Sequence, residues 1–240
     1  MKIHTRIILT ATLCLSLTSS LAQTADAPKA TPYFGGFTDK LFGSNISYSA
    51  VMELQTGKAK PVVAQKFFDE GKSRQELDLA ALLPSGLGIE KGSAGKYIQL
   101  FLPDKNAWYQ VHPEIKGYLE MPFPKPTTVQ RESDYRMELT PLGKETLDGH
   151  ACIRNKTVVT DSQGHQKEYT VWNATDLNQF PVKIQTTNSL GESESTFYRN
   201  IKLAKPDAKL FELPAGYRKY TDLGVMMQDI MTKQMQGFGR

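Results

Sequence analysis

The segment Ile46-Ser47-Tyr48-Ser49-Ala50-Val51-Met52-Glu53-Leu54-Gln55 decides the fold. Its even-numbered side chains are apolar, and most of its odd-numbered ones are polar, which is the period of a β-strand with one buried face. The same alternation recurs further along the chain, in Ile98/Leu100/Leu102, Tyr135/Met137/Leu139, Val182/Ile184 and Phe197/Ile201/Leu203. The middle of the chain therefore predicts one large antiparallel sheet.

Short turn signals separate these runs: Thr56-Gly57-Lys58, Asp69-Glu70-Gly71, Pro103-Asp104-Lys105, Asp161-Ser162-Gln163-Gly164 and Ser189-Leu190-Gly191. They place strands at about residues 45–55, 61–69, 72–79, 95–102, 106–112, 116–121, 134–140, 149–160, 166–173, 181–188 and 194–203. A mainly β fold of this size, with few helices, can enclose a cavity. What covers the apolar face of the sheet is therefore the functional question.

Three segments outside the strands are expected to be helical. Residues 33–43 are rich in aromatic side chains at helical spacing, and Leu79, Leu82 and Leu83 form one turn that Pro84 ends. A helix follows Asp222, with an apolar stripe made by Leu223, Met227, Ile230, Met231 and Met235. We expect this closing helix to cover the concave face of the sheet, either as a fixed core helix or as a mobile lid.

The N-terminus has the pattern of a secretory signal. Lys2 and Arg6 precede an apolar stretch, and small residues at 20 and 22 predict cleavage after Ala22. Cleavage after Ala27 also fits, but Pro28 would follow the cut directly. The stretch is shorter than the roughly 20 apolar residues that span a bilayer, so residues 1–22 are expected to be removed and not retained as an anchor. Residues 23–32 are then a flexible leader and residues 33–240 a single exported domain.

Charge and cysteine content exclude several classes. The signal holds two of the 29 basic residues and none of the 25 acidic ones, so the mature chain carries a net charge of only +2. With no long cluster of Lys and Arg, a nucleic-acid partner is not expected. Cys14 leaves with the signal, so Cys152 has no partner for an intramolecular disulfide.

Catalytic and metal-binding patterns are not found. The sequence has no Gly-x-Ser-x-Gly elbow, phosphate loop or His-Glu-x-x-His, so no catalytic residue and no cofactor are assigned. His150 and Cys152 share a strand face, but a metal site needs three or four ligands, so Cys152 is expected to be a structural thiol. His112 and His165 lie at a strand end and in a hairpin turn, where we expect them to be solvated.

Arg74 is the charged residue of greatest interest. If its strand face turns inward, it can pair with a ligand head group or hold a covering segment; otherwise it faces solvent. Together with the apolar helical residues, it gives a candidate set for ligand binding: Arg74, Leu82, Leu83, Met227, Ile230 and Met231.

The chain resembles the lipoprotein-carrier-like (LolA-like) superfamily of bacterial envelope proteins over about residues 33–222. The motifs that carry the resemblance are Leu147-Asp148-Gly149-His150 with Cys152, Val171-Trp172-Asn173-Ala174, Phe180-Pro181-Val182-Lys183-Ile184, Pro206 to Tyr217, Arg74, and Trp108 to Tyr118 with His112-Pro113-Glu114. The similarity is to a periplasmic branch and not to the carrier LolA itself. The residues around Arg74 do not match the carrier's own pattern.

The resemblance implies an incomplete antiparallel barrel with helices on its concave apolar face. It also implies a non-enzymatic protein that holds an acyl chain, lipid or lipoprotein in that concavity. The alternative is an interaction or stress-sensing module that fills its own concavity and binds another envelope protein. The expected partners are thus a hydrophobic small molecule, lipid or lipoprotein, with an envelope protein as the second possibility.

Overall fold

The computed structural model describes residues 36–45, 47–78, 80, 95–123 and 134–237. In these ranges twelve strands form a single sheet in the order β12-β6-β5-β4-β3-β2-β1-β11-β10-β9-β8-β7. The strands are β1 (Ser47–Thr56), β2 (Val62–Asp69), β3 (Lys72–Asp78), β4 (Lys96–Leu102), β5 (Ala107–His112), β6 (Gly117–Pro122), β7 (Arg136–Leu147), β8 (His150–Thr160), β9 (Gln166–Ala174), β10 (Phe180–Thr187), β11 (Ser193–Lys202) and β12 (Arg218–Tyr220). Every pairing is antiparallel except that of β12 with β6.

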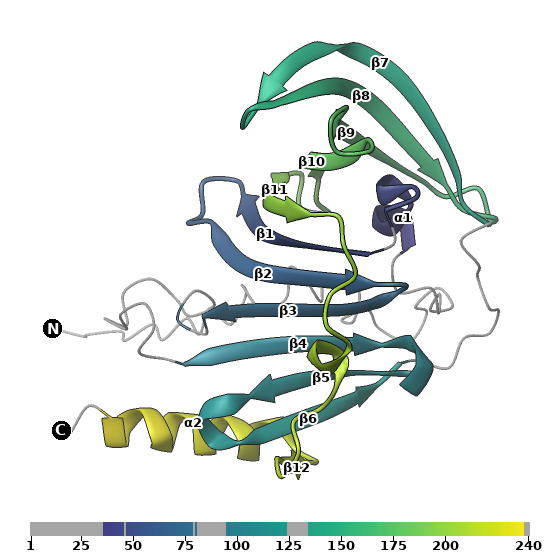
Figure 1. Ribbon diagram of the computed structural model, residues 1–240. Helices are drawn as coiled ribbons and strands as arrows, with labels where there is room; N and C mark the ends of the chain where they lie inside the picture. The colour runs from purple at the N-terminus through teal and green to yellow at the C-terminus, as the bar shows by residue number, and fades with distance from the viewer. Residues whose placement is uncertain (1–35, 46, 79, 81–94, 124–133, 238–240) are drawn as a thin grey trace, which may run out of the picture.

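The sheet curves but does not close, because β7 and β12 are two separate edges. Figure 1 shows strands β7 to β11 arching over a short helical segment, made of α1 (Gly36–Asp39) and the 3-10 helix η1 (Lys40–Phe42). The mainly β fold and the incomplete barrel expected from the sequence are confirmed. The predicted strands match the observed ones within a few residues, except that β7 runs on to Leu147 and the three-residue β12 was missed.

Local sequence explains how the strands are joined. Asp148 and Gly149 have φ of +51° and +86° and connect β7 to β8 as a two-residue turn, for which Asp-Gly is well suited. Strand β7 tolerates Pro141 because it lies at an edge of the sheet, where the missing N–H interrupts no second ladder. The register shifts between Pro141 and Gly143, so a bulge continues the strand where the sequence predicted its end.

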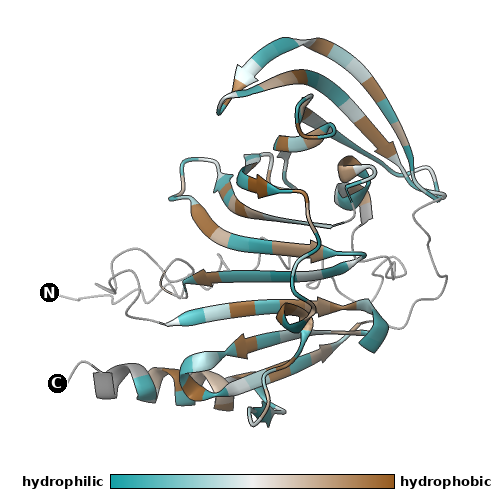
Figure 2. Cartoon of the chain, in the orientation of Figure 1, coloured by the Kyte–Doolittle hydropathy of each residue, from teal (hydrophilic) through white to brown (hydrophobic). Residues whose placement is uncertain are grey.

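The two faces of the sheet have separate cores. The inner face belongs to the larger cluster, which includes Leu41 and Phe42 of η1. The outer face of β4 and β5 forms the smaller cluster and is covered by the segment that holds η6 (Ala208–Phe211), which crosses these strands in Figure 1. Figure 2 shows brown apolar positions alternating with teal polar ones along many of the strands.

The C-terminal helix α2 (Leu223–Gly237) packs against β6, β12 and the 3-10 helix η4 (Pro113–Ile115), at one edge of the sheet. Of the α2 side chains that the structure describes, Met226 and Ile230 are buried, whereas Leu223, Met227 and Met231 are exposed. Of the predicted stripe, Ile230 is buried as expected, the prediction is wrong for Leu223, Met227 and Met231, and the side chain of Met235 lies outside the described residues. The helix is rotated so that Met226 and Ile230 join the core cluster that contains Tyr220, the last residue of β12 before the helix. In the described chain, no helix is long and apolar enough to cross a membrane.

Candidate functional site

The inner face is divided into two parts that are filled differently. Over β7 to β11 and β1, the η1 side chains occupy the face. The Phe42 ring lies 5.2 Å from the ring of Tyr48, 5.3 Å from that of Phe180 and 5.5 Å from that of Tyr198. We call this part the aromatic half. It has the close aromatic packing of a protein core.

The other part of the inner face, on β2 to β6, carries a row of polar side chains, which we call the polar row. Register pairs Lys66 with Gln75, Gln75 with Gln99, and Gln99 with Gln110, so four neighbouring strands each place one polar side chain in line. The row lies on the inner face, since Lys66 pairs with Ala50 of the inner cluster, and Gln75 and Gln99 are 7% and 8% exposed. The row ends at Leu119 of β6.

Apolar and aromatic side chains border the polar row on both sides. One neighbouring row joins Phe68, Ser73, Phe101 and Trp108 by the same strand register, and the rings of Phe101 and Trp108 stack at 5.9 Å. The other neighbouring row contains Leu77 and Tyr97. A polar line between apolar borders is the arrangement expected where an amphiphilic molecule binds, because chain and head need different surroundings.

Lys66 is the positive charge of the polar row. Burial lowers the pKa of its ammonium from 10.5 to about 8, and the negative charge of Asp39 in α1 offsets only part of that shift. Its Nζ donates a hydrogen bond of 2.5 Å to Ser73 Oγ. No ion pair of Lys66 occurs in the described part of the chain. A desolvated ammonium without a carboxylate partner disfavours folding, and such groups concentrate at functional sites.

Gln75 is the second uncompensated group. Its Oε1 is buried and accepts no hydrogen bond from any described residue. The neighbouring amides differ: Gln99 Nε2 donates to the hydroxyl of Tyr97 at 3.2 Å, and Gln110 Nε2 contacts Met121 Sδ at 3.6 Å. A buried carbonyl without a donor costs about 1–3 kcal/mol, so Gln75 is a place where a bound molecule can contribute a missing hydrogen bond.

His112 closes the same half of the face and corrects an expectation. The sequence predicted a solvated side chain, but His112 is 4% exposed, and burial lowers its pKa to about 4. Its ring lies 5.0 Å from the ring of Tyr97. It is therefore a neutral core residue at neutral pH. His165, in contrast, is exposed as predicted and pairs with Asp161 in its hairpin turn.

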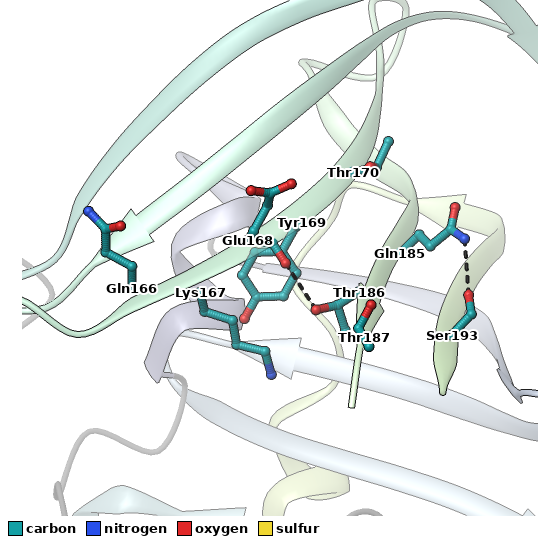
Figure 3. Close-up of a pocket in the computed structure, with 9 residues that line it drawn as sticks. All are labelled: Gln166, Lys167, Glu168, Tyr169, Thr170, Gln185, Thr186, Thr187 and Ser193. Atoms are coloured by element: carbon teal, nitrogen blue, oxygen red, sulfur yellow. Dashed lines mark hydrogen bonds between the residues drawn. The ribbon is translucent and has the colours of Figure 1, made fainter. Parts of the chain in front are cut away.

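An open hollow of about 530 Å³ is lined by residues of β9, β10 and β11 (Figure 3). Its lining is mainly polar: Gln166, Lys167, Glu168, Tyr169, Thr170, Gln185, Thr186, Thr187 and Ser193. Several of these groups already satisfy one another, since Gln185 Nε2 donates to Ser193 Oγ and Thr186 Oγ1 donates to Glu168 O, both at 3.0 Å. The hollow is thus a weaker candidate for ligand binding than the polar row.

Arg74 lies on the outer face, opposite Gln75. Its Nη1 donates to Leu210 O at 3.0 Å and its Nε to Glu76 Oε1 at 2.7 Å, so it holds the covering segment of η6. Burial would raise the pKa of Glu76, but hydrogen bonds from Lys96 and Arg74 outweigh it and lower that pKa. Arg74 therefore does not face inward; it holds a covering segment on the outer face, and a role at a ligand head group stays a prediction.

The remaining predicted ligand residues do not meet at one place. Met227 and Met231 are exposed on α2, Ile230 is buried at the β6–β12 edge, and Leu82 and Leu83 lie outside the described residues. A ligand role for any of them stays a prediction.

Cys152 has the structural position expected of it. It is 2% exposed on β8, and burial raises the pKa of its thiol. His150 pairs with Asp176 at 2.7 Å on the surface instead of joining a metal-binding group. Within the described ranges, no group of three or more His, Cys, Asp or Glu side chains could hold a metal ion.

Neither a protein family nor a curated protein matches the chain. Solved structures do. An uncharacterized conserved protein from Thermus thermophilus is 11% identical, with a TM-score of 0.44 over 77% of this chain and 96% of that one. MucB in complex with MucA is 11% identical, with a TM-score of 0.41 over 78% of this chain and 62% of that one.

The LolA superfamily protein NE2245 from Nitrosomonas europaea is 12% identical, with a TM-score of 0.32 over 72% of this chain and 93% of that one. The fold itself rests on the strand order described above, and no ligand or activity is carried over from the matched proteins.

Proposed function

We propose that this protein is an exported, non-enzymatic binding protein that holds an acyl chain, a lipid or a lipoprotein against the inner face of β2 to β6. The observation that carries the proposal is the polar row between apolar borders, with an unpaired ammonium at Lys66 and an unpartnered carbonyl at Gln75. The N-terminal signal pattern supports the periplasm as its location. Transfer of an acyl chain from water is worth about 0.8 kcal/mol per buried CH₂, enough to drive binding without chemistry.

The two tryptophans of the chain allow a direct test. Trp108 lies beside the polar row, and Trp172 lies on β9, away from that row, with Lys183 Nζ 4.1 Å from its ring centroid. We expect a brominated fatty acid to quench the fluorescence of Trp108 in the Trp172→Phe variant, and to leave Trp172 unquenched in the matched Trp108→Phe variant. Quenching confined to Trp172, or none in either variant, would contradict the proposed location.

Lipid extraction of protein purified from a periplasmic fraction, followed by mass spectrometry, tests the class of ligand. We expect acyl-bearing molecules to copurify in repeated preparations. A protein that never carries them, and that takes up no fluorescent fatty acid, would not be a carrier.

A second function, binding of another envelope protein, is favoured by one feature. Strand β7 presents an edge of twelve residues, most of them exposed, with Leu139 and Leu142 47% and 46% exposed. An extended segment of a partner can add a strand to such an edge. Crosslinking in intact cells distinguishes the two functions, since a reproducible protein partner without copurifying acyl chains favours this second one.

A further inference from the structure

The ligand's head group is defined by two neighbours on the polar row. Lys66 and Gln75 are register partners on β2 and β3, so their side chains leave the same face side by side. Within the described ranges the Lys66 ammonium makes one hydrogen bond, to Ser73, although it carries three donor hydrogens. The Oε1 of Gln75, whose residue is 7% exposed, accepts no hydrogen bond from the residues that the structure describes.

The two unmet demands are chemically opposite. The ammonium requires an acceptor, preferably a negatively charged one, because charge-assisted hydrogen bonds are the stronger ones. The Gln75 carbonyl requires a donor. A plain carboxylate satisfies only the first demand and an alcohol satisfies the second without supplying charge, so one head group must offer both an anion and an adjacent hydroxyl or amide N–H.

We propose that the polar row selects acyl chains whose head carries an anionic group next to a hydrogen-bond donor, with the anion at Lys66 and the donor at Gln75. This inference rests on the proposed function and names its ligand class. The adjacent row of Phe68, Phe101 and Trp108 gives the hydrocarbon chain an apolar surface to lie on. Neutral lipids, which lack the anion, should bind with lower affinity.

Three probes of the same chain length test the proposal: 2-hydroxymyristic acid, myristic acid and methyl myristate. Their dissociation constants are measured on the full mature chain, by displacement of a fluorescent fatty acid. We expect 2-hydroxymyristic acid to bind most tightly. The dissociation constant of methyl myristate should be at least about tenfold higher than that of myristic acid. Lys66→Met should abolish the preference for acid over ester, and Gln75→Leu should abolish the preference for the hydroxylated acid.

Lys58→Met is the matched control for Lys66→Met, because Lys58 is exposed in the β1–β2 turn and the charge change is the same. It should bind all three probes as the wild type does, and Lys66→Arg should retain the preference for acids. The ranking of the probes on the wild type is informative even if a variant fails to fold.

Equal affinities of the wild type for all three probes would overturn the head-group inference and leave the proposed acyl binding intact. Binding of none of them would overturn both. Loss of the acid preference in Lys58→Met as well would show that overall charge, and not Lys66, creates it.

Discussion

The two halves of the inner face use one sheet in opposite ways. In the aromatic half, Phe42 fits among the rings of Tyr48, Phe180 and Tyr198, and the chain completes its own core. The other half, on β2 to β6, contains the polar row, and we call it the polar half. There Lys66 has a lowered pKa, and Gln75 has a carbonyl oxygen without a partner among the described residues. The first half is arranged for stability, whereas the second retains groups that cost stability.

A residue that disfavours folding needs a reason other than folding to be where it is. We therefore expect residues of the aromatic half to stabilise the sheet and residues of the polar half to serve ligand binding. Substitutions in the aromatic half should lower stability, and some substitutions in the polar half should raise it.

The largest effect is expected in the aromatic half. Phe42→Ala removes a buried ring and leaves a cavity, which should lower the free energy of unfolding by about 3–5 kcal/mol. Urea unfolding followed by circular dichroism measures it. Thr38→Ala in the exposed part of α1 loses one 3.4 Å contact with the Tyr169 hydroxyl and should cost less than about 1 kcal/mol. A small effect of Phe42→Ala would mean that η1 is not part of the core.

The next effect should have the opposite sign. The folded pKa of Lys66, about 8, lies below its ordinary 10.5, so between these values the unfolded chain binds more protons and stability rises with pH. At pH 7 the buried ammonium disfavours folding by about 3 kcal/mol, which Lys66→Met should recover. Urea unfolding should show that this gain shrinks as the pH rises from 8 towards 10.5. Destabilisation by Lys66→Met at pH 7 would contradict the claim that the polar half contains groups that disfavour folding.

His112 gives a smaller effect that depends on acid. Its folded pKa of about 4 lies below the ordinary 6.5, so the unfolded state binds more protons between these values and stability falls as the pH drops through them. Between pH 7.5 and pH 5 this contribution should lower stability by about 2 kcal/mol. His112→Gln should be less sensitive to pH over that range, as urea unfolding at both pH values would reveal. An unchanged pH dependence would show that other groups produce it.

The smallest effect belongs to Cys152 in the core of β8. Cys152→Ser places a hydroxyl where the thiol is 2% exposed, and we expect a loss of about 1 kcal/mol with ligand binding unchanged. Since burial raises the pKa of the thiol, native protein should react slowly with a thiol reagent at pH 7. Rapid labelling would show that this part of the aromatic half opens readily.

Most strands could be predicted from the sequence because each alternates and each hairpin has its own turn signal. Strand β1 is the clearest case, and Glu70-Gly71, with φ of +48° and +88°, forms the β2–β3 turn that the sequence predicted. Strand β12 could not be found, since three residues contain no periodicity and its pairing with β6 depends on the whole fold. The face of α2 was misjudged because Met226 and Met227 are equally apolar in sequence, and only the packing of Tyr220 selects Met226.

The polar row was missed for a different reason. Gln99 and Gln110 lie in β4 and β5, where both faces are buried, so alternation does not reveal which side chains point inward. The signal was a Gln or Lys in each of four successive strands. Aligning these residues requires the register of β3 with β4, which no short turn fixes because residues 79–95 separate the two strands. The charge of Arg74 made it the candidate in the sequence, but the neighbouring Gln75 faces inward.

The position of β1 in the middle of the sheet also has a consequence in time. Its neighbours are β2, which follows it directly, and β11, where Ser49 meets Lys202 near the far end of the chain. Strands β2 to β6 and β7 to β11 can each assemble by contacts local in sequence, whereas the β1–β11 ladder requires closure of a long loop. During synthesis one edge of β1 therefore stays unpaired until β11 has been made. Until then this edge can form hydrogen bonds with an incorrect strand. Folding of the whole sheet should be slow, and its last step should be the pairing of β1 with β11.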